Sequence, residues 1–183
     1  EMLSEAMEKD MGGDYIPPMF LCQSMDKLDL YGTIDACVCC LDSVNYVTDP
    51  RKLRRAFERV HLFLMPGGLF IFDINTVYKH REVLADNTFV YDMDDVYCVW
   101  QNSTDENLLT TVNLDIFEKD EQEDVYYKYS EQFCERGYSL EKITQWVEQC
   151  NFEVIGIYEE MTTEPVKPDT QRAVFVLKKH GTQ

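Results

Sequence analysis

Polar residues follow three apolar runs of the chain, and they carry side chains with which a protein can bind and deprotonate a ligand. The polar segments are Ser24 to Asp26, Leu41 to Tyr46 and Asp73 to Tyr78. Hydroxyl, amide and carboxylate groups hold polar ligands by hydrogen bonds, and tyrosine or aspartate can move a proton. If the apolar runs are strands of one open α/β sheet, their carboxyl ends meet at one crevice. We therefore expect these segments to line a single site.

The spacing of apolar residues predicts the elements that position this site. Residues 1–10 have the spacing of a helix, and Met19–Cys22 is predicted to be a short strand. The run 34–41 is apolar on both faces, as in a parallel strand that helices cover from both sides. The first half of the chain therefore predicts strands buried between helices.

A strand-helix-strand unit follows. Asp49 and Pro50 have the pattern of a helix start, and we expect this helix to end at Pro66-Gly67-Gly68. The buried strand 69–72 comes next, so the crossover from the preceding strand is expected to be right-handed. This unit predicts an α/β fold, and 183 residues fit one domain over 1–183.

The pattern changes after about residue 81. Short alternating runs, separated by acidic or polar turns, predict an antiparallel β cap over residues 86–136 inserted into the domain. Its aromatic residues, Trp100 among them, either pack across strands or cover the crevice. Ser139 is expected to cap a helix, and two strands, 152–158 and 173–177, return the chain to the α/β form.

Composition excludes several classes of function. The formal net charge of −17 would repel a nucleic acid backbone, and the chain has no apolar stretch long enough to span a bilayer. Seven cysteines without a regular disulfide spacing indicate a cytoplasmic protein. Cys37 and Cys40 are expected to point to opposite faces of a strand, so we predict no metal site there.

Four segments follow one another along the chain in an order typical of a known family: 1–6, Cys22–Asp26, Cys40–Tyr46, and Leu64–Gly68 with the following 70–75. Together they resemble the class I S-adenosylmethionine-dependent methyltransferases, especially small bacterial members with an antiparallel cap. The resemblance implies a Rossmann-like sheet that is incomplete at its N-terminal strands, because the family's glycine-rich turn and the acidic residue of its second strand are missing. We expect a truncated form of such an enzyme.

The resemblance also implies roles for the polar segments. It places the adenine of S-adenosylmethionine at Ser24, Met25 and Asp26, and the methionine part at Leu41, Asp42 and Tyr46. The expected substrate contacts are Asn45, Asn75, Trp100 and Arg136. Tyr46 and Tyr78 are the expected catalytic residues. The implied partner is an unidentified small molecule, and a homodimer is possible.

Structural roles compete with these functional ones. Asp42 has the sequence context of a turn residue, Asn45 could close its loop on the sheet, and Asp73 could end its strand. His80 is expected to be a solvated surface residue. The alternative function is a non-catalytic methyltransferase-like module that binds or dimerises, and a nicotinamide-dependent oxidoreductase shares the broad fold but lacks matching motifs.

Overall fold

The structure is a computed structural model that describes residues 2–9, 12–13 and 16–181. The helical elements are α1 (Met2–Glu8), the 3₁₀ helix η1 (Met25–Lys27), α2 (Pro50–Phe63), the π-helix η2 (Lys79–Leu84) and α3 (Leu140–Gln149). The strands are β1 (Ile34–Cys39), β2 (Leu64–Asn75), β3 (Thr88–Asp92), β4 (Val96–Thr104), β5 (Leu109–Lys119), β6 (Tyr126–Arg136), β7 (Phe152–Glu159) and β8 (Arg172–Lys179). Residues 1 and 10 of the predicted first helix lie outside the described part.

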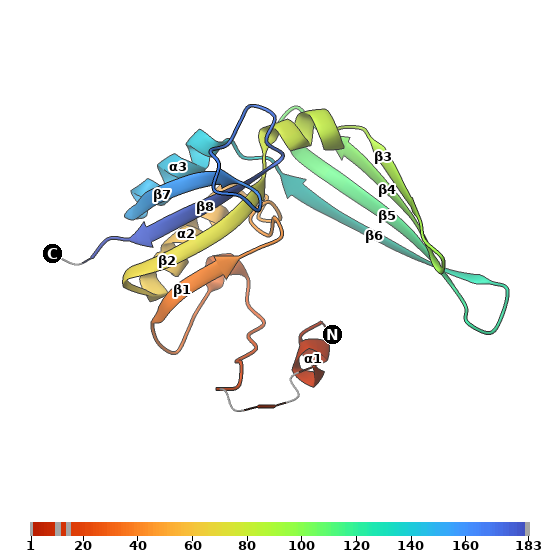
Figure 1. Ribbon diagram of the computed structural model, residues 1–183, viewed down its shortest axis with the longest axis horizontal. Coiled ribbons are helices and arrows are strands. Elements are labelled where there is room, and N and C mark those ends of the chain that lie inside the picture. Colours follow the sequence, from red (N-terminus) through yellow and green to blue (C-terminus); the bar gives the residue numbers. More distant parts are fainter. Residues whose placement is uncertain (1, 10–11, 14–15, 182–183) are drawn as a thin grey trace.

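A four-stranded core sheet has the order β1-β2-β8-β7. β1 and β2 are parallel, and β8 is antiparallel to its neighbours β2 and β7. α2 and α3 contribute to one hydrophobic core with alternate residues of the sheet (Figure 1). Phe57 of α2 stacks on Phe72, which stacks in turn on Phe175 of β8, with ring centroids 5.5 and 4.9 Å apart. The predicted α/β fold is therefore present.

The opposite face of this sheet is less covered. Val38 is 62% exposed and Leu69 39% exposed, although both lie in central apolar runs. The expectation that helices cover the 34–41 strand on both sides is wrong for the described residues, because α2 and α3 both pack on the same face.

Helix α2 begins as predicted but ends earlier. The Asp49 side chain accepts a hydrogen bond from the backbone N–H of Arg51, and Pro50 occupies the first helical turn. The helix ends at Phe63 and β2 starts directly at Leu64. Pro66-Gly67-Gly68 does not end the helix. It forms a bulge inside β2, where the register with β1 jumps from Ile34↔Leu64 to Ala36↔Leu69.

The second sheet is the cap, with the order β3-β4-β5-β6 and antiparallel pairing throughout. Its strands lie within residues 88–136. The cap projects away from the core sheet, and the two sheets meet near η2 and the end of β6 (Figure 1). Trp100 pairs with Leu114, and Leu114 pairs with Glu131, so these residues share one face of the cap.

The predicted strand Met19–Cys22 is wrong. Among the described residues, 16–24 form no strand, and β1 pairs only with β2. A strand exists only where its backbone finds a ladder partner, and apolar composition alone does not supply one. Further along, Ser139 caps α3 as predicted, since its side chain accepts from the N–H of Lys142. None of the helices in the described ranges is long and apolar enough to cross a membrane.

Candidate functional site

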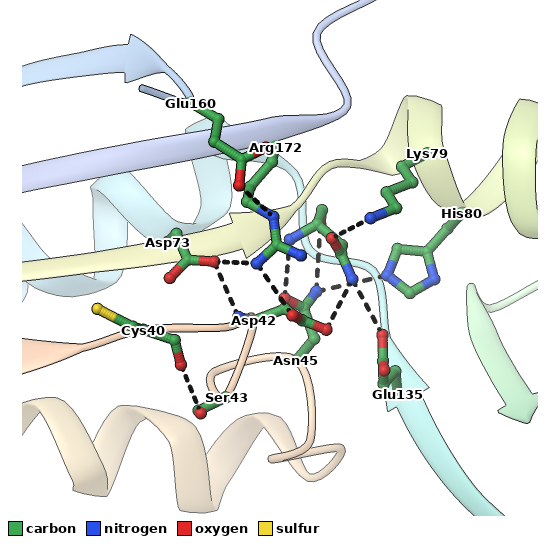
Figure 2. Close-up of polar contacts among 11 residues, drawn as sticks. Cys40, Asp42, Ser43, Asn45, Asp73, Lys79, His80, Glu135, Glu160 and Arg172 are labelled. Atoms are coloured by element: carbon green, nitrogen blue, oxygen red, sulfur yellow. Dashed lines mark hydrogen bonds and ion pairs between the residues drawn. The ribbon is translucent and has the colours of Figure 1, made fainter. Parts of the chain in front are cut away.

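Charged residues converge where β1 and β2 end and β8 begins (Figure 2). The Arg172 guanidinium donates to Asp73 and forms an ion pair of 2.9 Å with Asp42. Its Nε lies 3.2 Å from the Glu160 carboxylate. Because β8 runs antiparallel to β2, its first residue reaches the edge at which the parallel strands end. The predicted convergence of the segments after β1 and β2 is therefore observed.

The loop after β1 is held in an uncommon conformation. Leu41 and Asp42 have φ values of 58° and 48°, which place both in the left-handed region. The N–H of Asp42 donates to the Asp73 carboxylate over 2.8 Å, and Asn75 Nδ2 donates to the Asp42 carboxylate over 2.9 Å. The Asp42 side chain is thus fixed between a cation and an amide, so its orientation does not depend on a ligand.

Asn45 is completely buried and joins three parts of the molecule. Its Nδ2 donates to the backbone oxygens of Asn75 and Arg136, over 3.1 and 2.9 Å. Its Oδ1 accepts from the N–H of Asn75 over 2.9 Å. This pattern satisfies the side chain within the protein and favours the structural role for Asn45, in which it closes the loop on β2.

Glu135, on β6, brings a carboxylate from the cap into the same cluster. Asn75 Nδ2 lies 3.2 Å from the Glu135 carboxylate, and Lys79 Nζ donates to Asn75 Oδ1 over 2.9 Å. The residue is only 5% exposed. Burial, with the nearby negative charge of Asp42, raises the pKa of Glu135 to about 7. Sequence reasoning missed Glu135, because Asn75, which donates a hydrogen bond to its carboxylate, lies 60 residues away along the chain.

His80 lies at the junction of η2 and the cap and is fully buried, so the expectation of a solvated histidine is wrong. Its Nδ1 is 2.8 Å from Thr110 Oγ1, and its Nε2 is 3.4 Å from Asn45 Nδ2. Burial lowers the pKa of His80 to about 4, so the ring is neutral at neutral pH. A Cβ at Gly137 would come within 3.0 Å of this ring. The histidine therefore belongs to the packed connection between core and cap.

Tyr46 offers an accessible aromatic surface beside this cluster. It is 48% exposed and stacks on Phe133 of β6 with ring centroids 5.2 Å apart. Burial, with the neighbouring charges of Glu135 and Asp42, raises its pKa. Its hydroxyl therefore remains protonated at neutral pH and is able to donate a hydrogen bond. Trp100 lies on the same cap face as Phe133, and its indole N–H donates to Asn102 over 2.6 Å.

The segment Ser24–Asp26 lies beside β1. Ser24 is the N-cap residue of η1, and Met25 and Asp26 are the first two residues of that helix. Ser24 Oγ donates to the Asp26 carboxylate over 2.8 Å, which holds the pKa of Asp26 below its usual value. Ser24 and Met25 line a mostly apolar cavity of about 200 Å³ together with Cys39 and Val44. Val44 belongs to the loop after β1, so this cavity connects two of the predicted cofactor segments.

Two predicted site residues lie elsewhere. Tyr78 lines a different pocket, beside Thr76 and Ser139. The Arg136 guanidinium donates to the backbone oxygens of Thr48 and Asn107, over 2.7 and 2.9 Å. Because Arg136 follows Glu135 directly on β6, the two side chains point to opposite faces of the cap sheet. Within the described ranges, no group of three or more His, Cys, Asp or Glu side chains is placed to hold a metal ion.

Comparisons with known proteins give this site a context. No family model matches the chain. Its whole length aligns with 73% of "Putative methyltransferase YqeM" of Bacillus subtilis, at 27% identity. Among solved structures, this chain is similar to CalS10 from Micromonospora echinaspora, an amino pentose methyltransferase with bound S-adenosylmethionine. The two have a TM-score of 0.67 and 17% identity, and the match covers 86% of this chain and 63% of CalS10.

A second solved structure settles the family. It is an S-adenosylmethionine-dependent methyltransferase from Clostridium acetobutylicum, which is 32% identical and superposes with a TM-score of 0.91. The match covers 98% of this chain and 72% of that protein. The resemblance deduced from the four local matches is therefore confirmed, including the Rossmann-like fold and the cofactor. The chain belongs to the S-adenosylmethionine-dependent methyltransferases.

Proposed function

We propose that this protein transfers a methyl group to a small-molecule acceptor that lies between the carboxyl edge of the core sheet and the cap. The stack of Tyr46 on Phe133 carries this proposal, because it joins the loop after β1 to the cap and leaves an aromatic surface accessible. CalS10 acts on an amino pentose, which supports a small acceptor for this fold. The alternative of a non-catalytic module is not favoured, since the relatives are methyltransferases.

The residues at this edge fit the cofactor. The apolar cavity beside Ser24 and Met25 suits an adenine ring, and the serine hydroxyl can bond its polar edge. The carboxylates of Asp42 and Glu135 suit the positive charge of a sulfonium. The cofactor supplies an electrophilic methyl group when it is bound. These residues would hold it, while Leu41, at 77% exposure, would contact its methionine part.

The protein's own task is then to align the acceptor and exclude water. Tyr46 can donate a hydrogen bond to the acceptor from its protonated hydroxyl, and its ring provides a flat surface for packing. Asp42 and Asn75 are held by hydrogen bonds and ion pairs before any ligand arrives, so the polar edge is preorganised. We expect Tyr46 to be more important than Tyr78, which lines a separate pocket.

Assembly and location belong to the same proposal. A homodimer is the proposed assembly, and analytical ultracentrifugation of the full-length protein measures it directly. All seven cysteines are free, which supports a reducing cytoplasm.

The test of the proposed function uses the native full-length protein. Calorimetry with S-adenosylhomocysteine should detect binding, and label from S-[methyl-¹³C]adenosylmethionine should reach molecules in an ultrafiltered extract of the producing cells. Tyr46→Ala should lower the rate of label transfer at least tenfold. Tyr31→Ala, at a tyrosine that is 90% exposed and precedes β1, is the matched control and should leave it unchanged. Absence of both cofactor binding and label transfer would refute the proposal.

A further inference from the structure

The two faces of the cap sheet differ in charge. One face carries Phe133, the side chains at every second position from it along β6, and the residues that pair with these across the sheet. We call it the inner face because Phe133 stacks on Tyr46. The inner face contains carboxylates and aromatic rings. The lysines and arginine of the cap strands, Lys119, Lys128 and Arg136, alternate onto the other face. Strands β3 to β6 therefore present an inner face without a basic side chain.

Two carboxylates flank the aromatic pair on this face. Glu131 and Glu135 stand two residues before and two residues after Phe133, so their side chains point to the same side of β6. Both negative charges contribute to the raised pKa of Tyr46. Further along the same face, Tyr127 and Tyr129 are more than half exposed. Carboxylates beside accessible aromatic faces are the chemistry that recognises an organic cation.

The cofactor cannot account for all of this negative charge. At about 3.3 Å per residue, Glu131 and Glu135 are separated by roughly 13 Å along the strand, so one sulfonium cannot lie against both. Among the nearby cations, Arg172 is bound to Asp42 and Asp73, while Lys79 donates to Asn75 and its charge acts on Glu135. The cap strands add no basic side chain to the inner face, so Glu131 and Glu135 together carry more negative charge than Lys79 offsets, and a second, positively charged molecule would match the remainder.

We propose that the acceptor is an amine, bound as an ammonium ion by the inner face of the cap and deprotonated by Glu135. This inference rests on the proposed function and specifies the substrate class of the same site. The aromatic pair Tyr46 and Phe133 packs against the ammonium, and Glu131 holds the outer part of the molecule. Glu135 is the catalytic base.

The reaction balances in atoms and charge. The ammonium gives one proton to the Glu135 carboxylate, which frees the nitrogen lone pair. That lone pair forms the bond to the methyl carbon while the carbon–sulfur bond breaks, and the bonding electrons remain on sulfur. The products are an N-methylammonium ion and S-adenosylhomocysteine, and the Glu135 carboxylic acid returns its proton to water. Burial raises the pKa of Glu135 to about 7, which suits a base that must take up and release a proton near neutrality.

The first experiment asks whether the acceptor nitrogen is required. The full-length protein receives S-[methyl-¹³C]adenosylmethionine and an ultrafiltered cell extract, either untreated or with its amines acetylated by an amine-selective reagent. We expect the label on nitrogen in the untreated extract and a loss of at least tenfold after acetylation. Label that is unaffected by acetylation, or that is found on oxygen or carbon, overturns the amine proposal alone. Absence of label in both extracts refutes the proposed function instead.

The second experiment separates the roles of the two carboxylates. Glu135→Gln keeps the size of the side chain and should lower the rate of N-methylation about 100-fold, the scale of a general base. It should also remove the rise in rate as the pH increases through about 7. Glu131→Gln should raise the acceptor KM and preserve kcat. Glu123→Gln, in the turn between β5 and β6, is the control and should change neither.

A readout without turnover completes the test. The ¹³C signal of the Glu135 carboxyl group, assigned by its absence in Glu135→Gln, should titrate near pH 7 in the free protein. A midpoint close to that of ordinary glutamates, or a Glu135→Gln variant with the wild-type rate and pH profile, would rule out Glu135 as the base.

Discussion

Arg172 joins three segments of the site through its side chain. It binds Asp42 from the loop after β1, Asp73 from β2 and Glu160 from the segment after β7. The side chains of Arg172, Asp42 and Asp73 are each no more than 15% exposed. Removal of one member of such a buried cluster leaves charges without partners, which costs far more than the loss of a surface ion pair.

We therefore predict that Arg172→Ala lowers the free energy of unfolding by about 3–5 kcal/mol. Arg172→Lys should recover part of this loss, because it keeps the charge but cannot bond several carboxylates with one planar group. Arg51→Ala, which breaks an ion pair at a 91% exposed arginine, should leave the free energy of unfolding nearly unchanged, because solvent screens such a pair. Urea unfolding measures all three. Equal losses for Arg172→Ala and Arg51→Ala would show that the cluster is not stabilising.

His80 and Glu135 have opposite effects on the dependence of stability on pH. Folding lowers the pKa of His80 from 6.5 to about 4, so its contribution is present above pH 6.5 and is lost as the pH falls towards 4. Folding raises the pKa of Glu135 from 4.5 to about 7, so its contribution is present below pH 4.5 and is lost as the pH rises towards 7. Between these values the two effects nearly cancel in the wild-type protein.

Single substitutions should reveal each effect. Glu135→Gln should change how the free energy of unfolding depends on pH between 6.5 and 4.5. Relative to wild type, the free energy of unfolding of this variant should fall by roughly 1.4 kcal/mol for each unit by which the pH is lowered. His80→Gln should add a slope of similar size and opposite sign. Chemical unfolding at several pH values in this range provides the measurement. Two variants with slopes of the same sign would contradict the assigned protonation states.

At the scale of elements, local signals in the sequence predicted correctly those features that are formed by neighbouring residues of the chain, such as helix starts. The cap at Asp49, the proline that follows it and the cap at Ser139 each predict a helix start, and the structure has α2 and α3 at these places. Apolar composition failed at Met19–Cys22 because a strand also needs a neighbour with which to pair. The early start of β2 was missed because Pro66-Gly67-Gly68 is a common turn sequence and is used here as a bulge.

This bulge makes Gly68 critical. A Cβ at Gly68 would meet the backbone oxygens of Asp35 and Met65 at 2.8 and 2.9 Å, and backbone atoms cannot move aside cheaply. We predict that Gly68→Ala lowers the free energy of unfolding by about 1–3 kcal/mol, the usual cost of overpacking. Gly32→Ala has open space around its Cβ and should change stability by less than about 0.5 kcal/mol. Thermal unfolding of the two variants should differ clearly, and indistinguishable midpoints would refute the close contact.

At the scale of the whole molecule, the site is formed where two sheets meet. The sequence predicted the segments at the carboxyl ends of β1 and β2, since that edge follows from the α/β pattern. It did not predict Glu135 or Arg172, because their placement depends on how the cap and β8 return to this edge, and it stopped one residue short of Lys79, which directly follows the predicted segment Asp73 to Tyr78. The sorting of charge between the cap faces also emerges only from strand register, which a single sequence leaves undetermined.

The central claim is that cofactor and acceptor meet between the core sheet and the inner face of the cap. A crystal structure of the full-length protein with S-adenosylhomocysteine tests it most directly. We predict the adenine in the cavity lined by Ser24 and Met25, and the sulfur directed towards Tyr46 and Glu135. Cofactor bound away from the loop Leu41–Tyr46, or with its sulfur turned from the cap, would contradict this account.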